Sequence, residues 1–255
     1  TILVKTFFYE NVIPGNTTRL IETRIIFRRA GEWHFADYLW EESQDEALLD
    51  TAGTGYNIPI EWMQNGETMS TVFRVPSPTE CFICHKNNNL RIPIGPKPQN
   101  LNKDYRYADG TTNQIQKWIE TGYLDSAIPS GITTVIDWTD TSQDLELRVR
   151  SYFDMNCAHC HVDGGHCGAR ELRLPFSQSA DHYNLGICTP PDEPIPNLDN
   201  TTLIVPGDAQ NSILFFRVNT TLEEYRMPFT GRSITHTEFV VLLEEWINSL
   251  TDTCD

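Results

Sequence analysis

Short runs of alternating hydrophobic and polar residues fill the first 75 positions of the chain. The runs "TILVKTFFYE", "TRLIETRIIFR", "EWHFADYLW" and "STVFRVP" are rich in β-branched and aromatic residues, and turn-forming stretches such as "IPGN" and "AG" separate them. Residues of this kind favour strands, and tight turns between them favour antiparallel pairing. We therefore predict an antiparallel β-rich segment over residues 1–78.

A helical period replaces this pattern in two stretches of the second half. In "TSQDLELRVRSYFDMNCAHCH", Thr141 is a candidate N-cap, and apolar residues recur at helical spacing up to the cysteines. In "THTEFVVLLEEWINSL", Thr235 and Glu238 have the spacing of a capping box before an apolar stripe. The two stretches predict amphipathic helices. Their apolar positions are Leu145, Val149, Tyr152 and Phe153 in the first, and Phe239, Leu242, Leu243, Trp246 and Leu250 in the second.

The middle of the chain has a shorter helical pattern and more prolines. Pro76 and Pro78 come just before "CFICHKNNN", so no long helix is expected to lead into that stretch. Further on, "TTNQIQKWIETGYL" places Ile115, Trp118 and Ile119 on one face of a predicted helix.

Composition and charge narrow the classes of function. The chain has 255 residues, 39% of them hydrophobic, which suffices for one sizeable core or two modest ones. Its formal net charge is −16, which argues against nucleic acid as a partner because phosphates require a basic surface. No apolar run approaches the roughly 18 residues of a membrane span. Because the chain begins with a threonine, we expect it to be processed or truncated, with any export signal already removed.

Cysteine spacing carries the most specific chemistry. The chain contains seven cysteines, and four of them form the pattern C-x-x-C-H twice, as "CFICH" and "CAHCH". In this pattern two thiols can bond to the two vinyl groups of one haem, and the adjacent histidine can ligate the iron beneath the ring. The predicted attachment residues are Cys81 and Cys84 with the proximal ligand His85, and Cys157 and Cys160 with the proximal ligand His161.

Other cofactors explain less of the pattern. Two C-x-x-C pairs can share one zinc ion, but zinc gives no reason for a histidine directly after each pair. An iron–sulfur cluster also leaves both histidines unexplained, and a thioredoxin-like pair is not expected twice. We therefore predict two covalently bound haem c groups.

The sixth iron ligand determines what each haem does. A methionine gives a six-coordinate electron carrier with a raised potential, whereas an open position allows ligand binding or catalysis. The chain has four methionines, and Met227 lies in a proline- and glycine-containing loop, "EEYRMPFTGRS". The order of the second half is therefore helix, C-x-x-C-H, long loop, methionine loop and amphipathic helix.

This order closely resembles a class I cytochrome c. In that family the first and last helices cross, and the methionine loop closes over the distal face of the haem. The resemblance implies that Met227 is the sixth ligand of the second haem.

The first motif departs from this plan, because no methionine lies between His85 and Asp154. The sequence therefore does not assign the distal ligand of the first haem, and the candidates are Met63, Met69, Met155 and His34. The remaining alternative is a five-coordinate, reactive haem.

A wider resemblance covers nearly the whole chain. The segments "LIETR", "YLWEESQDEALL", "VPSPTECFICH", "NQIQKWIETGYL", "YFDMNCAHCH", "IVPGDAQNSILFFRV" and "RMPF" resemble a family of exported bacterial di-haem proteins with an N-terminal β domain. The resemblance implies a periplasmic or extracellular location. The expected fold class is α+β, with a β-rich segment (1–78) followed by mainly α-helical cytochrome c-like parts. These parts are a partial first haem segment (79–139) and a class I-like domain with the second haem (140–255).

The remaining cysteines are expected to be oxidised or to form contacts between chains, because covalent haem implies export. A disulfide between Cys167 and Cys188 would close the loop that separates them. Cys254 is the odd thiol, for which two alternatives stay open: an unpaired cysteine or a bridge to another chain. His159 lies between two attachment cysteines and is interpreted as a spacer, and His166 has no assigned role.

Three functions are compatible with these features. The first is electron transfer between redox partner proteins. The second is a haem enzyme, peroxidase-like or other, in which the second haem feeds an open first haem, although no acid–base pair is identifiable beside "CFICHK". The third is a haem-bearing subunit of an extracellular assembly or filament, with self-association through the β-rich segment or Cys254.

Overall fold

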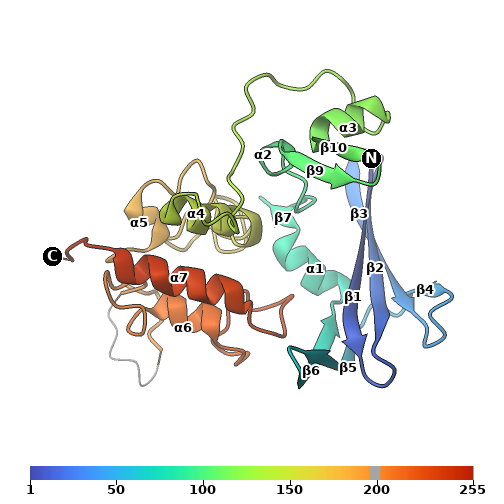
Figure 1. The fold of residues 1–255 in the computed structure, drawn as a ribbon, viewed down its shortest axis with the longest axis horizontal. Helices are drawn as coiled ribbons and strands as arrows, with labels where there is room; N and C mark the ends of the chain where they lie inside the picture. Colours follow the sequence, from blue (N-terminus) through green and yellow to red (C-terminus); the bar gives the residue numbers. More distant parts are fainter. Residues whose placement is uncertain (196–201, 255) are drawn as a thin grey trace.

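The computed structural model describes residues 1–195 and 202–254, and its largest element is a curled antiparallel sheet resembling half a barrel (Figure 1). The sheet has six strands in the order β4-β3-β2-β1-β5-β6. Their bounds are β1 (Ile2–Val12), β2 (Thr17–Arg29), β3 (Glu32–Trp40), β4 (Ala47–Leu49), β5 (Tyr56–Gln64) and β6 (Glu67–Val75).

Tight turns set the register of two of its hairpins. Ala30 and Gly31 both have positive φ angles, as do Asn65 and Gly66. Two consecutive positive φ angles are typical of the two-residue turns whose twist matches that of paired strands. The adjacent strand residues pair directly across these turns, as in Gln64 with Glu67.

The sheet has its own hydrophobic cluster, which comprises Val12, Ile21, Ile60, Trp62 and Val75. Aromatic rings extend it, with the Tyr9 ring 5.0 Å from the Trp62 ring between centroids. Full burial of a side chain such as Ile60 contributes about 1.5–3 kcal/mol. The sheet therefore has a core separate from that of the C-terminal part.

Short elements connect the sheet to the C-terminal part. They are α1 (Pro78–Cys84), β7 (Lys86–Asn87), β8 (Leu90–Arg91), α2 (Pro98–Leu101), β9 (Asp104–Tyr107), β10 (Gly110–Asn113) and α3 (Gln114–Glu120). Prolines start α1 and α2, where the missing N–H costs nothing.

Four helices form the C-terminal part of the described chain, and the two longest pack together (Figure 1). These helices are α4 (Leu145–Asn156), α5 (His182–Leu185), α6 (Ile213–Asn219) and α7 (Thr237–Ser249). The Tyr152 ring of α4 stacks on the Phe239 ring of α7 with 3.5 Å between centroids. Together with Phe153 and Trp246, these rings centre the larger hydrophobic core of the molecule.

The predicted fold class is wrong in its helical part. Only 22% of the chain is helical, so the parts after the sheet are not mainly α-helical cytochrome domains. Between Cys157 and Asp181 the described chain runs through turns, where glycines and prolines interrupt any helix. The two long helices lie near their predicted positions, but Asp144 caps α4 instead of Thr141, and the His236 side chain makes no capping hydrogen bond to α7.

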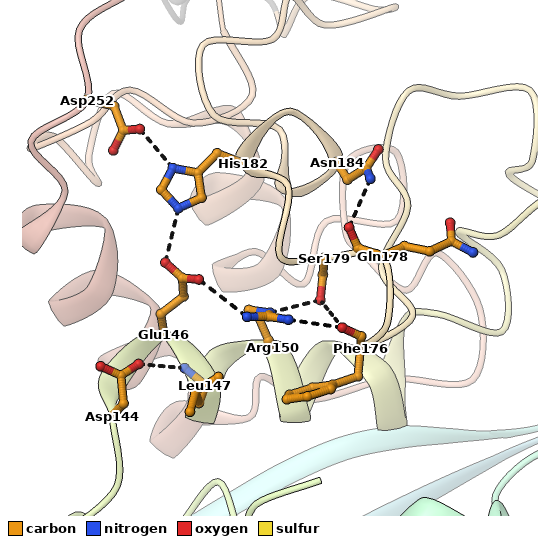
Figure 2. Close-up of polar contacts among 10 residues, drawn as sticks. All are labelled: Asp144, Glu146, Leu147, Arg150, Phe176, Gln178, Ser179, His182, Asn184 and Asp252. Atoms are coloured by element: carbon orange, nitrogen blue, oxygen red, sulfur yellow. Dashed lines mark hydrogen bonds and ion pairs between the residues drawn. The ribbon is translucent and has the colours of Figure 1, made fainter. Parts of the chain in front are cut away.

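The disulfide of the structure joins Cys188 to Cys254, with 5.2 Å between their Cα atoms, so the predicted pairing of Cys167 with Cys188 is wrong. The chain after α7 returns to the start of α5, where Asp252 binds His182 at 2.8 Å (Figure 2). Sequence spacing could not reveal this return, because tertiary packing brings the tail to Cys188. Cys254 is consequently not available as a free thiol.

A polar network supports the same region (Figure 2). His182 bridges Asp252 of the tail and Glu146 of α4, and Glu146 also pairs with Arg150 at 3.6 Å. Arg150 then donates to the Ser179 hydroxyl and to the Phe176 carbonyl.

Among the described residues, the helices are too short or too polar to span a membrane.

Candidate functional site

The first C-x-x-C-H motif lies at the end of α1, against the sheet. A capping box fixes the start of this helix, because Ser77 accepts from the Glu80 N–H and Glu80 accepts from the Ser77 N–H. Arg74 of β6 pairs with the Glu80 carboxylate at 2.8 Å, and this holds the pKa of Glu80 at about 2. Cys81 is buried, and His85 caps the helix by donating its N–H to the Cys81 carbonyl.

The His85 side chain is oriented in a way that suits a metal ligand. Its Nδ1 lies 3.1 Å from the Ile92 carbonyl oxygen, which leaves Nε2 to face a ligand. Histidines that bind metals usually donate their other ring N–H to such a carbonyl. Burial lowers the pKa of His85, which favours the neutral ring, and the Phe35 ring lies 5.0 Å away between centroids.

The second motif follows α4 directly, with Cys157 as the C-cap of that helix. A further turn places His161 over it, since the His161 N–H donates to the Cys157 carbonyl at 3.0 Å. Burial lowers the pKa of His161 to about 4, so its ring is neutral near pH 7. Within the described chain, its buried Nδ1 has no hydrogen-bond partner.

A cavity of about 410 Å³ opens beside the second motif. Its lining includes Cys157, His161 and Met227, which come from widely separated parts of the sequence. The backbone holds Met227 in place, because its N–H donates to the Arg217 carbonyl at 2.8 Å. Apolar side chains such as Phe153 line the interior.

The cavity also contains residues whose roles the sequence left open or misassigned. His166 and Cys167 both line it, and the His166 ring lies 5.3 Å from the Phe229 ring between centroids. Cys167 is a free thiol. Charged side chains lie at the same cavity, and Arg170 forms an ion pair there with Glu193 at 3.0 Å.

The two motifs meet in space. Ligand atoms of Cys84, His159 and Cys160 all lie within 4.8 Å of one another. The loops that follow the motifs are hydrogen-bonded as well, with the Asn88 N–H donating to the Gly164 carbonyl at 2.9 Å. Hydrogen bonds from Cys160 and His159 lower the pKa of the Cys84 thiol, while the pKa of Cys160 is raised by the same contact. His159, interpreted as a spacer, therefore contacts the first motif.

The candidates for the first distal ligand lie in different places. His34 stacks on Phe27, while its neighbour Phe35 contacts His85, and successive strand residues face opposite sides of a sheet. His34 therefore faces away from the first motif. Met155 lines a smaller cavity of about 220 Å³ together with Ile92, whose carbonyl oxygen contacts the His85 ring.

The two methionines of the β5–β6 hairpin lie away from the first motif. Met63 and Met69 lie near the turn of this hairpin, at the opposite end from Val75 and α1. Val75 lies six positions after Met69 along the strand, which is about 20 Å of extended chain. The structure therefore favours Met155 among the four candidates.

Sequence analysis missed a group of charged residues on the sheet. Glu22 is completely buried, and Arg24 binds its two carboxylate oxygens at 2.5 and 3.0 Å. Asp37 pairs with Arg24 across the strands, at 3.9 Å. Desolvation raises the pKa of Asp37 to about 6. The signal was present in "LIETRIIF", where charged residues interrupt an otherwise apolar strand.

Comparison with protein-family models, with curated proteins and with solved structures finds no match for this chain.

Three of the groups that covalent haem requires meet beside the second motif, whereas the second attachment cysteine, Cys160, lies with Cys84 and not in the cavity lining. A thiol, a neutral imidazole and a thioether line one cavity, whose volume falls in the roughly 300–1,000 Å³ range of cofactor sites. The four-cysteine zinc alternative fits less well, because only one cysteine of each pair belongs to the compact ligand group found among the described residues.

Proposed function

We propose that the chain is a di-haem c-type cytochrome that transfers electrons between partner proteins. The observation that carries this proposal is the cavity lined by Cys157, His161 and Met227. The two residue types expected as axial ligands of an electron-transfer haem reach this cavity from segments far apart in the sequence. Haem would supply the one-electron Fe(III)/Fe(II) couple there.

The chain's own residues would set the properties of the second site. Burial lowers the pKa of His161, so its ring is neutral near pH 7. A neutral imidazole has a free lone pair that can bind a metal. A thioether ligand from Met227 favours the reduced iron and so raises the potential. Phe153 and the other apolar lining residues would shield the inner part of the cavity, and the charged residues of the lining would lie nearby.

Contact between the two motifs supports transfer of electrons within the chain. Cys84 and Cys160 are each the second attachment cysteine of their motif, and their sulfur atoms lie within 4.8 Å. Haem groups bonded to these two sulfur atoms would therefore lie close to each other. The two sites would therefore form one internal path, with an entry at one end and an exit at the other.

Covalent attachment implies an exported protein, and the Cys188–Cys254 disulfide supports an oxidising location such as the periplasm or the cell exterior. The partners we propose are other redox proteins. Because Cys254 is bonded within the chain, any self-association belongs to the β-rich segment and not to this thiol.

The proposal is tested by intact mass and by a pyridine haemochrome assay on protein exported from a host with a haem-attachment system. We expect two covalent haems per chain, and one in the double variant Cys157→Ala/Cys160→Ala. The variant Cys167→Ala serves as the control, because its thiol lies beside the cavity but outside both motifs, and it should retain two. A native chain whose mass includes no haem would rule out the proposal.

A second candidate is a protein with a non-haem transition-metal site, favoured by the group of Cys84, His159 and Cys160. Two thiolates and an imidazole are a ligand set that zinc uses when a fourth position stays open. Metal analysis of the purified chain separates the candidates, because the same two thiols cannot bind haem and zinc together. One zinc per chain, lost in His159→Ala and without covalent haem, would favour this alternative.

A further inference from the structure

We propose that Asp37, with its neighbours Glu22 and Arg24, forms a proton-accepting site beside the first motif, so that one-electron reduction there is coupled to proton uptake. This inference rests on the proposed function, because it requires a redox group at Cys81, Cys84 and His85.

The sheet places this group on the face that carries the first motif. Phe35 and Asp37 are two residues apart on β3 and therefore point to the same side of the sheet. The Phe35 ring contacts the His85 ring, at 5.0 Å between centroids. Arg24 lies directly opposite Asp37 on β2, and its guanidinium covers the Phe7 ring at 4.2 Å from the centroid.

The charges of the group do not balance. Glu22 is completely buried and takes two hydrogen bonds from Arg24, so the one cation is already paired. Asp37 is left with a longer contact to Arg24, at 3.9 Å. Two carboxylates in a half-buried place with one guanidinium favour protonation of one of them, because like charges in low dielectric repel strongly.

Asp37 is the carboxylate that this arrangement protonates most easily. Its desolvation is the largest influence on its pKa, which is raised to about 6. Arg24 lowers this pKa, while the negative charges of Glu22 and of Asp50, beyond β4, raise it. The group therefore changes its charge within the physiological pH range, which an unperturbed aspartate does not.

Asp37 and Arg24 both act electrostatically on residues of the first motif. Asp37 is the largest charged influence on Cys81, whose pKa it raises, and Glu80 of α1 acts in the same direction. The positive charge of Arg24 lowers the pKa of His85. A change of charge on a group bonded to Cys81 and His85 would therefore be felt at Asp37, and the reverse holds by thermodynamic linkage.

The balanced step is simple. Haem held by Cys81, Cys84 and His85 would supply the one-electron couple, with a redox partner protein as electron donor, and one proton from solvent would bond to a carboxylate oxygen of Asp37. No other bond forms or breaks. The added negative charge raises the pKa of Asp37, so reduction and protonation favour each other.

The test is a redox titration of the two-haem protein between pH 5 and pH 8. The first centre is identified as the one whose spectrum Met227→Ala leaves unchanged. We expect its reduction equilibrium constant to fall with rising pH above the pKa of the oxidised state, with a limit of about tenfold per pH unit. In Asp37→Asn this dependence should vanish, and a carboxylic acid band in the reduced-minus-oxidised infrared spectrum should vanish with it.

A second variant and a control also test the role of Asp37. Glu22→Gln removes a neighbouring negative charge and frees Arg24, so the pH dependence should shift to lower pH. His182→Gln is the control, because His182 belongs to the tail network and should leave the dependence unchanged. An unaltered pH dependence in folded Asp37→Asn would overturn the inference, whereas a chain without haem at the first motif would overturn the proposed function instead.

Discussion

The two C-x-x-C-H motifs have the same chemistry but lie in very different surroundings. The first ends a seven-residue helix that lies against a sheet with a buried charged group, and the second ends a twelve-residue helix beside a cavity lined by both apolar and charged side chains. A methionine lines the second cavity, while Met155, a candidate ligand at the first motif, shares a smaller cavity with Ile92, whose carbonyl lies against His85. The same local pattern therefore stands in two different environments, and the chemistry of each site depends on its tertiary surroundings as well as on the pattern.

The proximal histidines differ in the same way. A backbone carbonyl holds the ring of His85, whereas the Nδ1 of His161 is buried without a partner in the described chain. A hydrogen bond from Nδ1 makes the other nitrogen a stronger donor to a metal. We therefore expect the first site to stabilise the oxidised iron more than the second does.

The largest expected effect comes from removing the methionine of the second site. Met227→Ala should abolish the far-red charge-transfer band of the oxidised protein and lower the potential of the second centre. The change should be a sizeable fraction of the roughly 0.8 V range that axial ligands span. Met69→Ala, exposed on the sheet hairpin, is the control and should leave the band unchanged. If the band persists in Met227→Ala, Met227 is not a ligand of the second haem, and the proposed difference between the two sites is wrong.

Loss of the disulfide should separate the stabilities of the two regions. Cys254→Ser opens a link between residues 66 positions apart, which removes about 4 kcal/mol of stability by the chain-entropy estimate. Denaturant unfolding should show this loss at the second haem, with little change in the sheet, because the two hydrophobic clusters are separate. Cys167→Ser is the matched control. Equal loss in both regions would mean that the chain unfolds as one unit.

A smaller effect is expected at the helix of the first motif. Ser77→Ala removes the side-chain acceptor of the capping box and should cost about 1 kcal/mol. The loss should appear at the first haem and spare the second. Thr141→Ala is a suitable control, because Asp144 and not Thr141 caps α4. If Ser77→Ala proves neutral, Arg74 and Glu80 alone hold the start of α1.

The smallest effect concerns the tail network and depends on pH. Hydrogen bonds with Asp252 and Glu146 raise the pKa of His182 in the folded chain. Its stabilising contribution is therefore complete below the unfolded pKa near 6.5 and is lost as pH rises through the higher folded pKa. Because the ring is partly exposed, we expect under about 1 kcal/mol. Unfolding of His182→Gln compared with the native chain at pH 5.5 and pH 9 measures this, and a difference larger at pH 9 would contradict it.

Features that depend on neighbouring residues could be predicted from the sequence, whereas features that depend on contacts between distant residues could not. Alternating strands and their tight turns could be predicted, because the signals are local, as at Asn65 and Gly66. The two long helices were found from their periodicity for the same reason. The partner of Cys188 and the contact between Cys84 and Cys160 were not foreseeable, because they join residues that only the folded chain brings together.

The helical content was overestimated for a physical reason as well. Resemblance in the motifs and the two long helices suggested helices throughout, yet the intervening chain holds its position through turns and backbone contacts. The Leu174 N–H, for example, donates to the His161 carbonyl at 3.0 Å. The charged group on the sheet was missed because charged residues in strands are usually solvent-exposed, and only the fold shows that Glu22 is buried.

The contact between the loops at Asn88 and Gly164 gives the molecule an internal spacer. Gly164 has a φ of +78°, and a Cβ atom there would lie 2.7 Å from the Asn88 side-chain oxygen. A methyl group there would require the Asn88 side chain to move, and the positive φ would strain any residue other than glycine. The close approach of these loops therefore suits a residue without a side chain, and under the proposed function this approach would help to fix the distance that an electron crosses between the two motifs.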